Sequence, residues 1–216
     1  MDSLPNVYQN FSFREPKVRK STGEFVDMKG KWAEEVFLNS NPIVLELACG
    51  RGEYTIGLAG MFPETNFIGV DLKGNRVFTG ARSAIEKELS NVAFLRTKIE
   101  LIQHFFAPGE VSAIWITFAD PFLNPTDANK RLTAPPFLEK YRSIMAKGGT
   151  IHLKTDSEVL YEYSLKVAQE QGLKILEQDD HIYKNGERSG PLSIKTYYEK
   201  MHLANQKTIK YLSFVL

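Results

Sequence analysis

Residues 43–71, IVLELACGRGEYTIGLAGMFPETNFIGVD, decide the fold of this chain. They open with a short run, residues 43–48, that is largely apolar on both alternating faces, as in a central parallel strand with helices on either side. The chain must then turn at Gly50 and Gly52, which tolerate positive φ and let a ligand approach the backbone because they have no Cβ. The stretch therefore predicts a buried strand that ends in a ligand-binding turn.

The second half of this stretch predicts a helix and another strand. Residues 53–61 show helical spacing of apolar side chains, and Pro63 prevents the helix from continuing. Residues 66–70 are typical of a strand, which ends at Asp71. In a doubly wound sheet an acidic side chain at this place holds a ribose, so we expect a nucleotide-type cofactor here.

Three features of the stretch qualify this interpretation. Glycine turns also occur without a ligand, and this loop lacks the third glycine of the G-x-G-x-x-G pattern. Glu46 lies inside the first strand, where a buried carboxylate needs a partner. Cys49 is either a nucleophile or a small buried side chain, and the second reading is favoured because no histidine base is near it in sequence.

The composition is that of an ordinary globular protein with one core. The chain has 216 residues, of which 43% are hydrophobic and 25% charged. Its single cysteine excludes an internal disulfide and suits a reducing compartment. Because we find neither a signal-like start nor an apolar segment of membrane-spanning length, we expect a cytoplasmic protein without a membrane partner.

The net charge of the chain does not by itself indicate a nucleic-acid partner. The net charge is +1, whereas nucleic-acid-binding domains are often much more basic. Two local patches remain as candidates for phosphate contact. The first comprises Arg14, Lys17, Arg19 and Lys20, and the second begins at 129–131 with the sequence NKR.

The alternation of segments along the whole chain predicts an α/β fold with a mostly parallel sheet of about seven strands and helices on both faces. Beyond the first two strands, we expect strands over 92–95, 113–118, 150–153, 173–177 and 209–215, the last of them antiparallel, and helices over 31–38, 74–89, 135–145 and 157–171. Residues 1–28 show no sustained periodicity and predict an extended arm with little structure of its own, although the aromatic residues Tyr8, Phe11 and Phe13 suggest that part of the arm packs. We therefore expect an arm and short helix over 1–40, and one domain over 41–216.

Two acidic residues follow later strands of the predicted sheet. Asp120 comes after the strand at 113–118, and Asp156 after the one at 150–153. The carboxyl ends of parallel strands share one edge, where substrates bind in such folds. Asp156 either contributes to a site there or caps the following helix. The long segment 179–207 is expected to be partly helical or to carry function.

With these pieces in place, the sequence resembles the bacterial tRNA (guanine-N7-)-methyltransferases over residues 43–216. The resemblance rests on LELACGRG, FIGVD, FADP, GGTIHLKTD and TYYE. The E-x-x-x-G-x-G pattern followed by an acid is shared with other class I methyltransferases, whereas its combination with FADP and TYYE is specific to this family. The resemblance implies a Rossmann-like class I fold that uses S-adenosylmethionine to methylate N7 of a guanine in tRNA, the variable-loop guanine.

The resemblance also assigns roles to single residues. It implies that Asp120 is catalytic. The residues that it places at the cofactor are Glu46, Gly50, Gly52, Asp71, Lys98 and Asp120. The residues that it places at the guanine or the RNA are Asn124, Lys130, Arg131, Asp156, Thr196 and Glu199.

The sequence departs from the family at three positions. Lys98 stands where the family has an acid on the adenine side, Ala119 replaces the proline before the catalytic aspartate, and Asn124 replaces a lysine. The loop over 122–131 is also poorer in cations than the family's, which should weaken phosphate attraction. These departures keep two alternatives open: methyl transfer to another acceptor, and a catalytically weakened tRNA-binding protein of the same fold. A dinucleotide dehydrogenase is the least favoured reading.

The expected reaction explains why acids rather than histidines lie at the strand ends. Guanine N7 already has a lone pair, so no base has to remove a proton, and the methylated purine is cationic. The histidines lack the spacing of metal ligands and are expected to be structural or exposed. The sequence leaves open whether the protein is a monomer or a homodimer.

Overall fold

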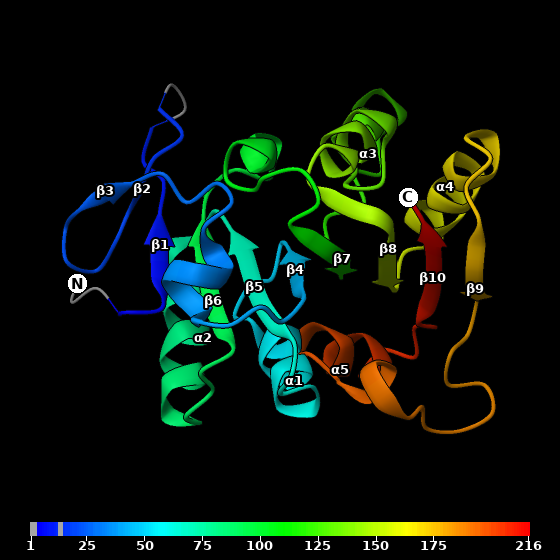
Figure 1. Ribbon diagram of the computed structural model, residues 1–216. Helices are drawn as coiled ribbons and strands as arrows, with labels where there is room; N and C mark the ends of the chain where they lie inside the picture. Colours follow the sequence, from blue (N-terminus) through cyan, green and yellow to red (C-terminus); the bar gives the residue numbers. More distant parts are fainter. Residues whose placement is uncertain (1–3, 13–14) are drawn as a thin grey trace.

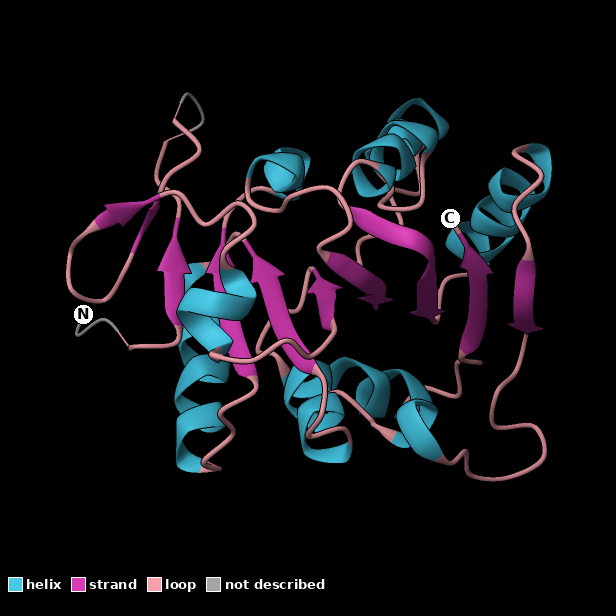
Figure 2. Ribbon diagram, viewed as in Figure 1, coloured by secondary structure: helices cyan, strands magenta, loops and turns pink. Residues whose placement is uncertain are grey.

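A ten-stranded sheet runs through the part of the computed structural model that is described, residues 4–12 and 15–216 (Figure 1; Figure 2). The strands, in the order β3-β2-β1-β6-β5-β4-β7-β8-β10-β9, are β1 (Val7–Gln9), β2 (Val18–Arg19), β3 (Phe25–Val26), β4 (Ile43–Leu47), β5 (Asn66–Asp71), β6 (Val92–Arg96), β7 (Val111–Thr117), β8 (Met145–Thr155), β9 (Ile175–Asp179) and β10 (Lys210–Val215). The α-helices are α1 (Glu53–Met61), α2 (Gly74–Glu86), α3 (Pro135–Arg142), α4 (Glu158–Glu170) and α5 (Tyr197–Ala204). Shorter helical segments are η1 (Trp32–Phe37), η2 (Ile99–His104), η3 (Pro125–Lys130) and η4 (Gly190–Ser193).

The strand at residues 43–47 occupies the centre of this sheet. β4 pairs in parallel with β5 on one side and with β7 on the other, and all five of its residues are buried. An apolar run covered on both faces is what the sequence predicted for it. β10 pairs antiparallel with both β8 and β9. The predicted α/β fold, mostly parallel with an antiparallel last strand, is therefore confirmed.

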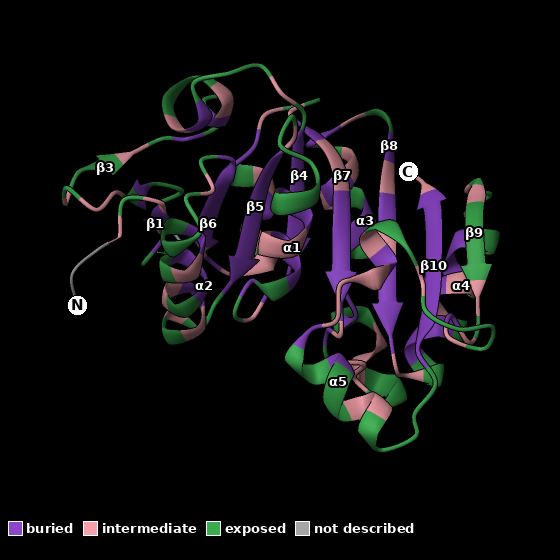
Figure 3. Cartoon of the chain, turned by 90° about the horizontal axis from the view of Figure 1, so that it is seen from below, coloured by how far each residue is buried: buried purple, intermediate pink, exposed green. Residues whose placement is uncertain are grey.

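Two helical layers cover the sheet. Figure 1 shows α1, α2 and α5 on one side, and α3 and α4 on the other. Each layer has its own apolar cluster: Tyr54, Val77 and Phe94 belong to the first, and Trp32, Tyr141 and Leu160 to the second. The layers leave the carboxyl ends of the parallel strands free of covering helix, except where α5 lies beyond β7 and β8 (Figure 3).

The N-terminal arm is extended and partly packed, as predicted, but it joins the sheet, so the prediction that it has little structure of its own was wrong. β1 pairs in parallel with β6, with Val7 opposite Phe94, and β2 pairs antiparallel with β1. Val7, Tyr8 and Val18 are buried. The arm is too short and polar to show a period, but the open edge of β6 supplies the hydrogen-bonding partner that its sequence alone does not reveal. Phe13, and Arg14 of the first basic patch, lie outside the described residues.

The long segment after β9 is partly helical, as predicted. It contains η4 and α5 before the chain enters the sheet again as β10. Tyr54 Oη of α1 donates a hydrogen bond to the carbonyl of Pro191 (2.6 Å), and Glu53 accepts one from the Tyr197 amide (2.7 Å). These contacts fasten the segment beside the turn that follows β4.

Candidate functional site

The two glycines of the turn after β4 are needed for different reasons. Both adopt left-handed backbone conformations, with φ of 57° at Gly50 and 67° at Gly52. A Cβ on Gly52 would lie 2.5 Å from the ring of Phe94, so packing against β6 forbids one. A Cβ on Gly50 would meet no described atom within 4 Å. The turn thus borders open space at Gly50, as a loop that receives a ligand must.

Glu46 has the partners that its burial in β4 demands. Its Oε1 accepts a hydrogen bond from Thr117 Oγ1 (2.6 Å), and its Oε2 accepts two from Thr55, from the amide (2.8 Å) and from the hydroxyl. Burial raises the pKa of Glu46 to about 7, although these hydrogen bonds act in the opposite direction. Glu46 therefore ties the start of α1 and the end of β7 to the central strand.

Asp71, at the end of β5, holds the backbone around the glycine turn. Its Oδ2 accepts a hydrogen bond from the Gly50 amide (2.9 Å), and its Oδ1 accepts one from the Lys73 amide (2.8 Å). Each carboxylate oxygen keeps a second lone pair for a ligand. Burial raises the pKa of the Cys49 thiol well above its usual value, which favours the reading of Cys49 as a buried side chain rather than a nucleophile.

The end of β6 adds Thr97 and Lys98 beside Asp71. The Thr97 amide donates a hydrogen bond to the Asp71 carbonyl (3.2 Å), and Lys98 precedes η2 with an extended backbone. Thr97 Oγ1 is buried, and no hydrogen-bond partner for it exists among the described residues. The sequence analysis did not include Thr97 among the candidate site residues. The feature that could have pointed to it is its hydroxyl group, placed directly after a buried strand.

Asp120 lies in a strained, exposed turn after β7. Phe118 and Phe122 flank it with φ of 52° and 43°, a conformation that costs free energy in residues other than glycine. Asp120 Oδ1 accepts a hydrogen bond from the Phe122 amide (3.0 Å), and the carboxylate stays exposed. The turn therefore presents an acid at the edge of the sheet that also carries the glycine turn.

Arg131 fixes this turn from beneath. Its Nε and Nη2 donate hydrogen bonds to the carbonyls of Pro121 and Phe122, both at 2.9 Å, and its guanidinium lies 4.4 Å from the ring centroid of Tyr163. The side chain is buried. The Arg131 guanidinium therefore binds the backbone of its own loop in this structure.

Two other loop residues expected at the RNA also have local partners. Asn124 accepts a hydrogen bond from the Thr126 amide (3.1 Å) and caps η3. Lys130 forms an ion pair with Asp127 (2.8 Å), and both Asn124 and Lys130 are exposed. An exposed pair of this kind opens at little cost, so Lys130 remains available to a phosphate.

Asp156, at the end of β8, belongs to a cluster that sequence reasoning did not assemble. Its Oδ2 lies 2.7 Å from Lys207 Nζ, and its Oδ1 lies 3.4 Å from His202 Nε2. The His202 ring stacks on Phe118, with 5.8 Å between centroids. Ser157, not Asp156, caps α4. His202 thus joins the turn of Asp120 to Asp156, a role that its isolated position in the sequence did not signal.

Thr196 and Glu199 lie behind this edge rather than in open space. Thr196 Oγ1 caps α5 by accepting a hydrogen bond from the Glu199 amide (3.2 Å). Glu199 is fully buried, and its Oε1 receives hydrogen bonds from Lys154 Nζ (2.8 Å) and from Tyr183 Oη (2.5 Å). Burial lowers the pKa of Lys154, and the neighbouring Glu199 carboxylate opposes that shift. These groups anchor α5 to β8.

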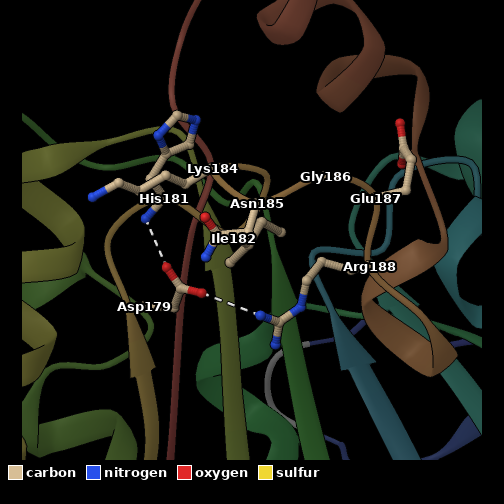
Figure 4. A pocket seen from close by; sticks show the side chains of 8 residues that line it. All are labelled: Asp179, His181, Ile182, Lys184, Asn185, Gly186, Glu187 and Arg188. Carbon is tan, nitrogen blue, oxygen red and sulfur yellow. Dashed lines mark hydrogen bonds and ion pairs between the residues drawn. The ribbon is translucent and has the colours of Figure 1, made fainter.

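A small hollow in the segment after β9 does not suit a nucleotide. It measures about 120 Å³ and is shown in Figure 4. Arg188 closes one side of it through an ion pair with Asp179 (3.2 Å). Sites for small-molecule ligands typically measure about 300 to 1,000 Å³, so this hollow is too small for one.

The comparisons with known proteins agree with the resemblance seen in the sequence. Residues 40–212 match the model of a family described as "Putative methyltransferase". A tRNA (guanine-N(7)-)-methyltransferase from Bacteroides fragilis is 51% identical over 190 residues, which cover 88% of this chain and 75% of that protein. The one from Porphyromonas gingivalis is 46% identical over 217 residues, covering all of this chain and 86% of that protein. The chain belongs to the tRNA (guanine-N(7)-)-methyltransferase family.

Solved structures support the class I fold of this tRNA (guanine-N(7)-)-methyltransferase family member. The 16S rRNA methyltransferase KamB has a TM-score of 0.66 at 12% identity, covering 89% of this chain and 96% of that chain. The antibiotic-resistance methyltransferase Kmr has a TM-score of 0.59 at 16% identity, covering 89% and 94%. At these identities the likeness concerns the fold alone, and it confirms the predicted Rossmann-like methyltransferase architecture.

Neither a metal centre nor a membrane-spanning helix is found in this family member within residues 4–12 and 15–216. These residues contain no group of three or more histidine, cysteine, aspartate or glutamate side chains placed to hold a metal ion. No helix among them has the length and apolar character needed to cross a bilayer.

Proposed function

We propose that this enzyme transfers the methyl group of S-adenosylmethionine to N7 of a guanine in tRNA, the variable-loop guanine. The observation that carries the proposal is the 46–51% identity to relatives that bear this activity in their names. The chain supplies Glu46 within β4 and acids at the ends of β5, β7 and β8, on one edge of the sheet. A cytoplasmic location fits a tRNA substrate.

The residues of the glycine turn fit the proposed cofactor. Gly50 faces open space, and Gly52 lets the turn lie close to β6. Asp71 has free lone pairs for the hydroxyls of a ribose, and Glu46 holds the turn in register with β7. S-adenosylmethionine, when bound, supplies an electrophilic methyl group on a sulfonium sulfur.

Lys98 lies where the adenine is proposed to bind, and a lysine donates but does not accept hydrogen bonds. Thr97 Oγ1, which has no partner within the described residues, is a hydroxyl acceptor at the same strand end. We therefore assign acceptance from the adenine amino group to Thr97 or to neighbouring backbone carbonyls, with Lys98 covering the ring.

Asp120 and Asp156 are the proposed contacts to the guanine. Their carboxylates accept hydrogen bonds from guanine N1–H and N2–H₂, which orients N7 and favours the positive charge that develops on the purine. Asp120 also borders the cofactor edge, since β7 neighbours β4. Thr196 and Glu199 contribute indirectly to guanine binding, because they hold α5 in place beside Asp120 and Asp156.

The loop that contains Asn124 and Lys130 is the proposed RNA-facing segment, and Arg131 keeps it in shape. Because Arg131 is buried on carbonyls, its loss should disorder the turn of Asp120 rather than remove a phosphate contact. The proposed partner is tRNA, bound with fewer phosphate contacts in this loop than a lysine-rich loop would make.

The direct test is the product. Unmodified tRNA made by transcription is incubated with the protein and S-adenosylmethionine, digested to nucleosides, and analysed by mass spectrometry with fragment mapping. We expect one N7-methylguanosine per tRNA, in the variable loop. N7-methylguanosine elsewhere would correct the position, and its complete absence would overturn the proposed reaction.

A second candidate, methyl transfer to another acceptor, draws on the same loop. Arg131 is bound to carbonyls of the loop and Asn124 is uncharged, so Lys130, in an exposed ion pair, is the one cation that these three residues offer to a phosphate. Methyl transfer from labelled S-adenosylmethionine to an extract depleted of tRNA distinguishes this candidate, because only another acceptor becomes labelled there.

A further inference from the structure

A second hollow lies where the N-terminal arm meets α2. It measures about 360 Å³, within the range of ligand sites. Its polar and aromatic lining comes from three places that the sequence separates widely: the arm, the first turns of α2 and the end of β6. These side chains are Gln9, Phe11, Arg19, Asn75, Phe78 and Arg96.

The hollow is cationic. Arg19 and Arg96 line it, and no acidic side chain does so among the described residues. The first turn of α2, a helix of thirteen residues, contains no acid either, although the Asp71 carboxylate accepts a hydrogen bond from the amide of Lys73, which precedes the helix. Gly74 lets Arg96 lie against this helix end, because a Cβ there would come within 3.0 Å of the guanidinium.

Aromatic rings stand beside these cations. Phe11 is 53% exposed, and the Arg96 guanidinium lies 5.4 Å from its ring centroid. Phe78 is half-buried, and the guanidinium of Arg82, which is not among the residues that line the hollow, lies 5.0 Å from its ring centroid. Aromatic rings beside arginines are the combination by which proteins stack bases and hold the backbone of single-stranded nucleic acid.

The hollow is distinct from the methyl-transfer edge but close to it. Arg96 lies opposite Asp71 in the sheet and donates a hydrogen bond to the Leu72 carbonyl (3.2 Å). In strand order, β6 is three steps from β7, which precedes Asp120. Three strand spacings amount to roughly 14 Å, more than one nucleotide away from the proposed acceptor guanine.

We propose that this hollow binds a nucleotide of the substrate RNA other than the one that is methylated, with its phosphate on Arg19 and Arg96 and its base against Phe11 and Phe78. The inference rests on the proposed function only in taking RNA as the substrate. It gives the arm a purpose beyond its pairing with β6, because the exposed side chains of Phe11 and Arg19 line the hollow. The arm thereby replaces positive charge that the loop after Asp120 lacks.

The test measures affinity for unmodified tRNA with S-adenosylhomocysteine saturating the cofactor site. Phe11→Ala should weaken binding about tenfold, as the loss of one stacked base does. Arg19→Ala should weaken it to a similar degree and reduce the slope of log affinity against log salt by about one. Cofactor affinity and thermal midpoint should remain as in the wild type.

Matched controls come from the same chain. Phe25→Ala removes an equally exposed ring, 58%, from β3 outside the hollow, and Lys147→Ala removes an exposed cation at the amino end of β8. Both should leave tRNA affinity within about twofold of the wild type.

The outcomes separate this inference from the proposed function. If the wild type forms N7-methylguanosine while Phe11→Ala and Arg19→Ala bind tRNA as the controls do, the inference is overturned and the reaction stands. If both variants lose tRNA affinity but no methylated product forms, the nucleotide site stands and the reaction is overturned. A wild type that does not bind tRNA overturns both.

Discussion

At the scale of single residues, the site is built from carboxylates in contrasting surroundings. Glu46 is buried and satisfied only by neutral donors, Thr55 and Thr117. Asp71 is held by backbone amides, whereas Asp120 is exposed in a strained turn. A buried acid fixes geometry, and an exposed one remains free to meet a substrate. The surroundings of each acid thus decide whether it holds the backbone of the site in place or can contact the substrate.

Glu46 should make stability depend on pH. Its folded-state pKa of about 7 lies above the unfolded value of 4.5, so the folded state binds the proton more tightly. The carboxyl's contribution to folding is therefore lost as pH rises through about 7. We expect Glu46→Gln to gain stability relative to the wild type between about pH 5 and pH 8, by roughly 2.5 kcal/mol of the total of about 3.5 kcal/mol that this shift represents at about 1.4 kcal/mol per pKa unit.

Urea unfolding of both proteins at several pH values measures this difference. Glu139→Gln, at an exposed carboxylate on α3, is the control and should show no comparable trend. A difference between Glu46→Gln and the wild type that stays constant with pH would show that Glu46 does not titrate in this range.

Asp120 should be needed for methyl transfer but not for folding. Because the carboxylate is exposed and bonds only the Phe122 amide, Asp120→Ala should leave the thermal midpoint and the cofactor affinity close to those of the wild type. Loss of a group that stabilises charge developing in a transition state typically costs 10²- to 10³-fold in rate, and we expect a loss of about this size. Single-turnover methylation of tRNA measures it, with the exposed Asp180→Ala as control; undiminished turnover would remove Asp120 from the mechanism.

At the scale of elements, α5 is positioned by a buried ion pair rather than by an apolar stripe. Lys154, near the end of β8, meets Glu199 in the first turn of α5, and Lys154 Nζ also donates hydrogen bonds to the carbonyls of Leu192 and Ile194. Such a pair is a weak source of net stability but penalises every arrangement that separates its members. It therefore specifies where α5 lies, beside the ends of β7 and β8.

Removing one member of this pair should be costly. Lys154→Met leaves the Glu199 carboxylate buried without its cation, and we expect a loss of about 3 to 5 kcal/mol in unfolding free energy. The double variant Lys154→Met with Glu199→Leu should recover much of that loss, because no unpaired charge remains. Urea unfolding of both variants measures the two changes.

The exposed pair of Lys166 and Glu170 on α4 provides the control. Lys166→Met should change the unfolding free energy by less than about 1 kcal/mol. An equal effect of Lys154→Met and Lys166→Met would show that the buried pair does not anchor α5.

The sequence predicts those features that depend on residues close together in the chain, and it does not predict contacts between residues far apart in it. α1 begins and ends where helical spacing and Pro63 place it, and β4 and β5 follow from their apolar runs. The acids at the strand ends follow from the same periodicity. The cluster of His202, Phe118 and Asp156 joins residues separated by up to 84 positions, and no local pattern reports such a contact. The burial of Arg131 and Glu199 was missed for the same reason, since a charge in a loop or first turn resembles a solvated one.

At the scale of the whole molecule, the arm and the sheet form one structure. Tyr8 of β1 packs edge-on against Trp32, with 5.0 Å between centroids, and Trp32 stacks on Phe106 and donates a hydrogen bond to the Phe105 carbonyl. The core under one helical layer therefore includes residues on both sides of the expected boundary at residue 40.

A substitution in the arm should consequently destabilise the entire protein. Tyr8→Ala removes a buried ring from this core and should cost about 3 to 4 kcal/mol in a single unfolding transition. Phe25→Ala, on an exposed ring of the same arm, should cost less than about 0.5 kcal/mol. Denaturant unfolding followed by tryptophan fluorescence and by circular dichroism measures both. Two separate transitions, of which Tyr8→Ala moves only one, would show that the arm is an independent unit.

The position of β10 has a consequence for the order of folding. β9 pairs with no strand except β10 within the described chain, and β10 lies between β8 and β9 although it follows both in sequence. β9 therefore stays unpaired until the later strand inserts, so two strand pairings form in one late step. A chain halted before residue 210 exposes the edge of β8 and a detached β9 together, which makes this end of the sheet the place where premature association with other chains begins.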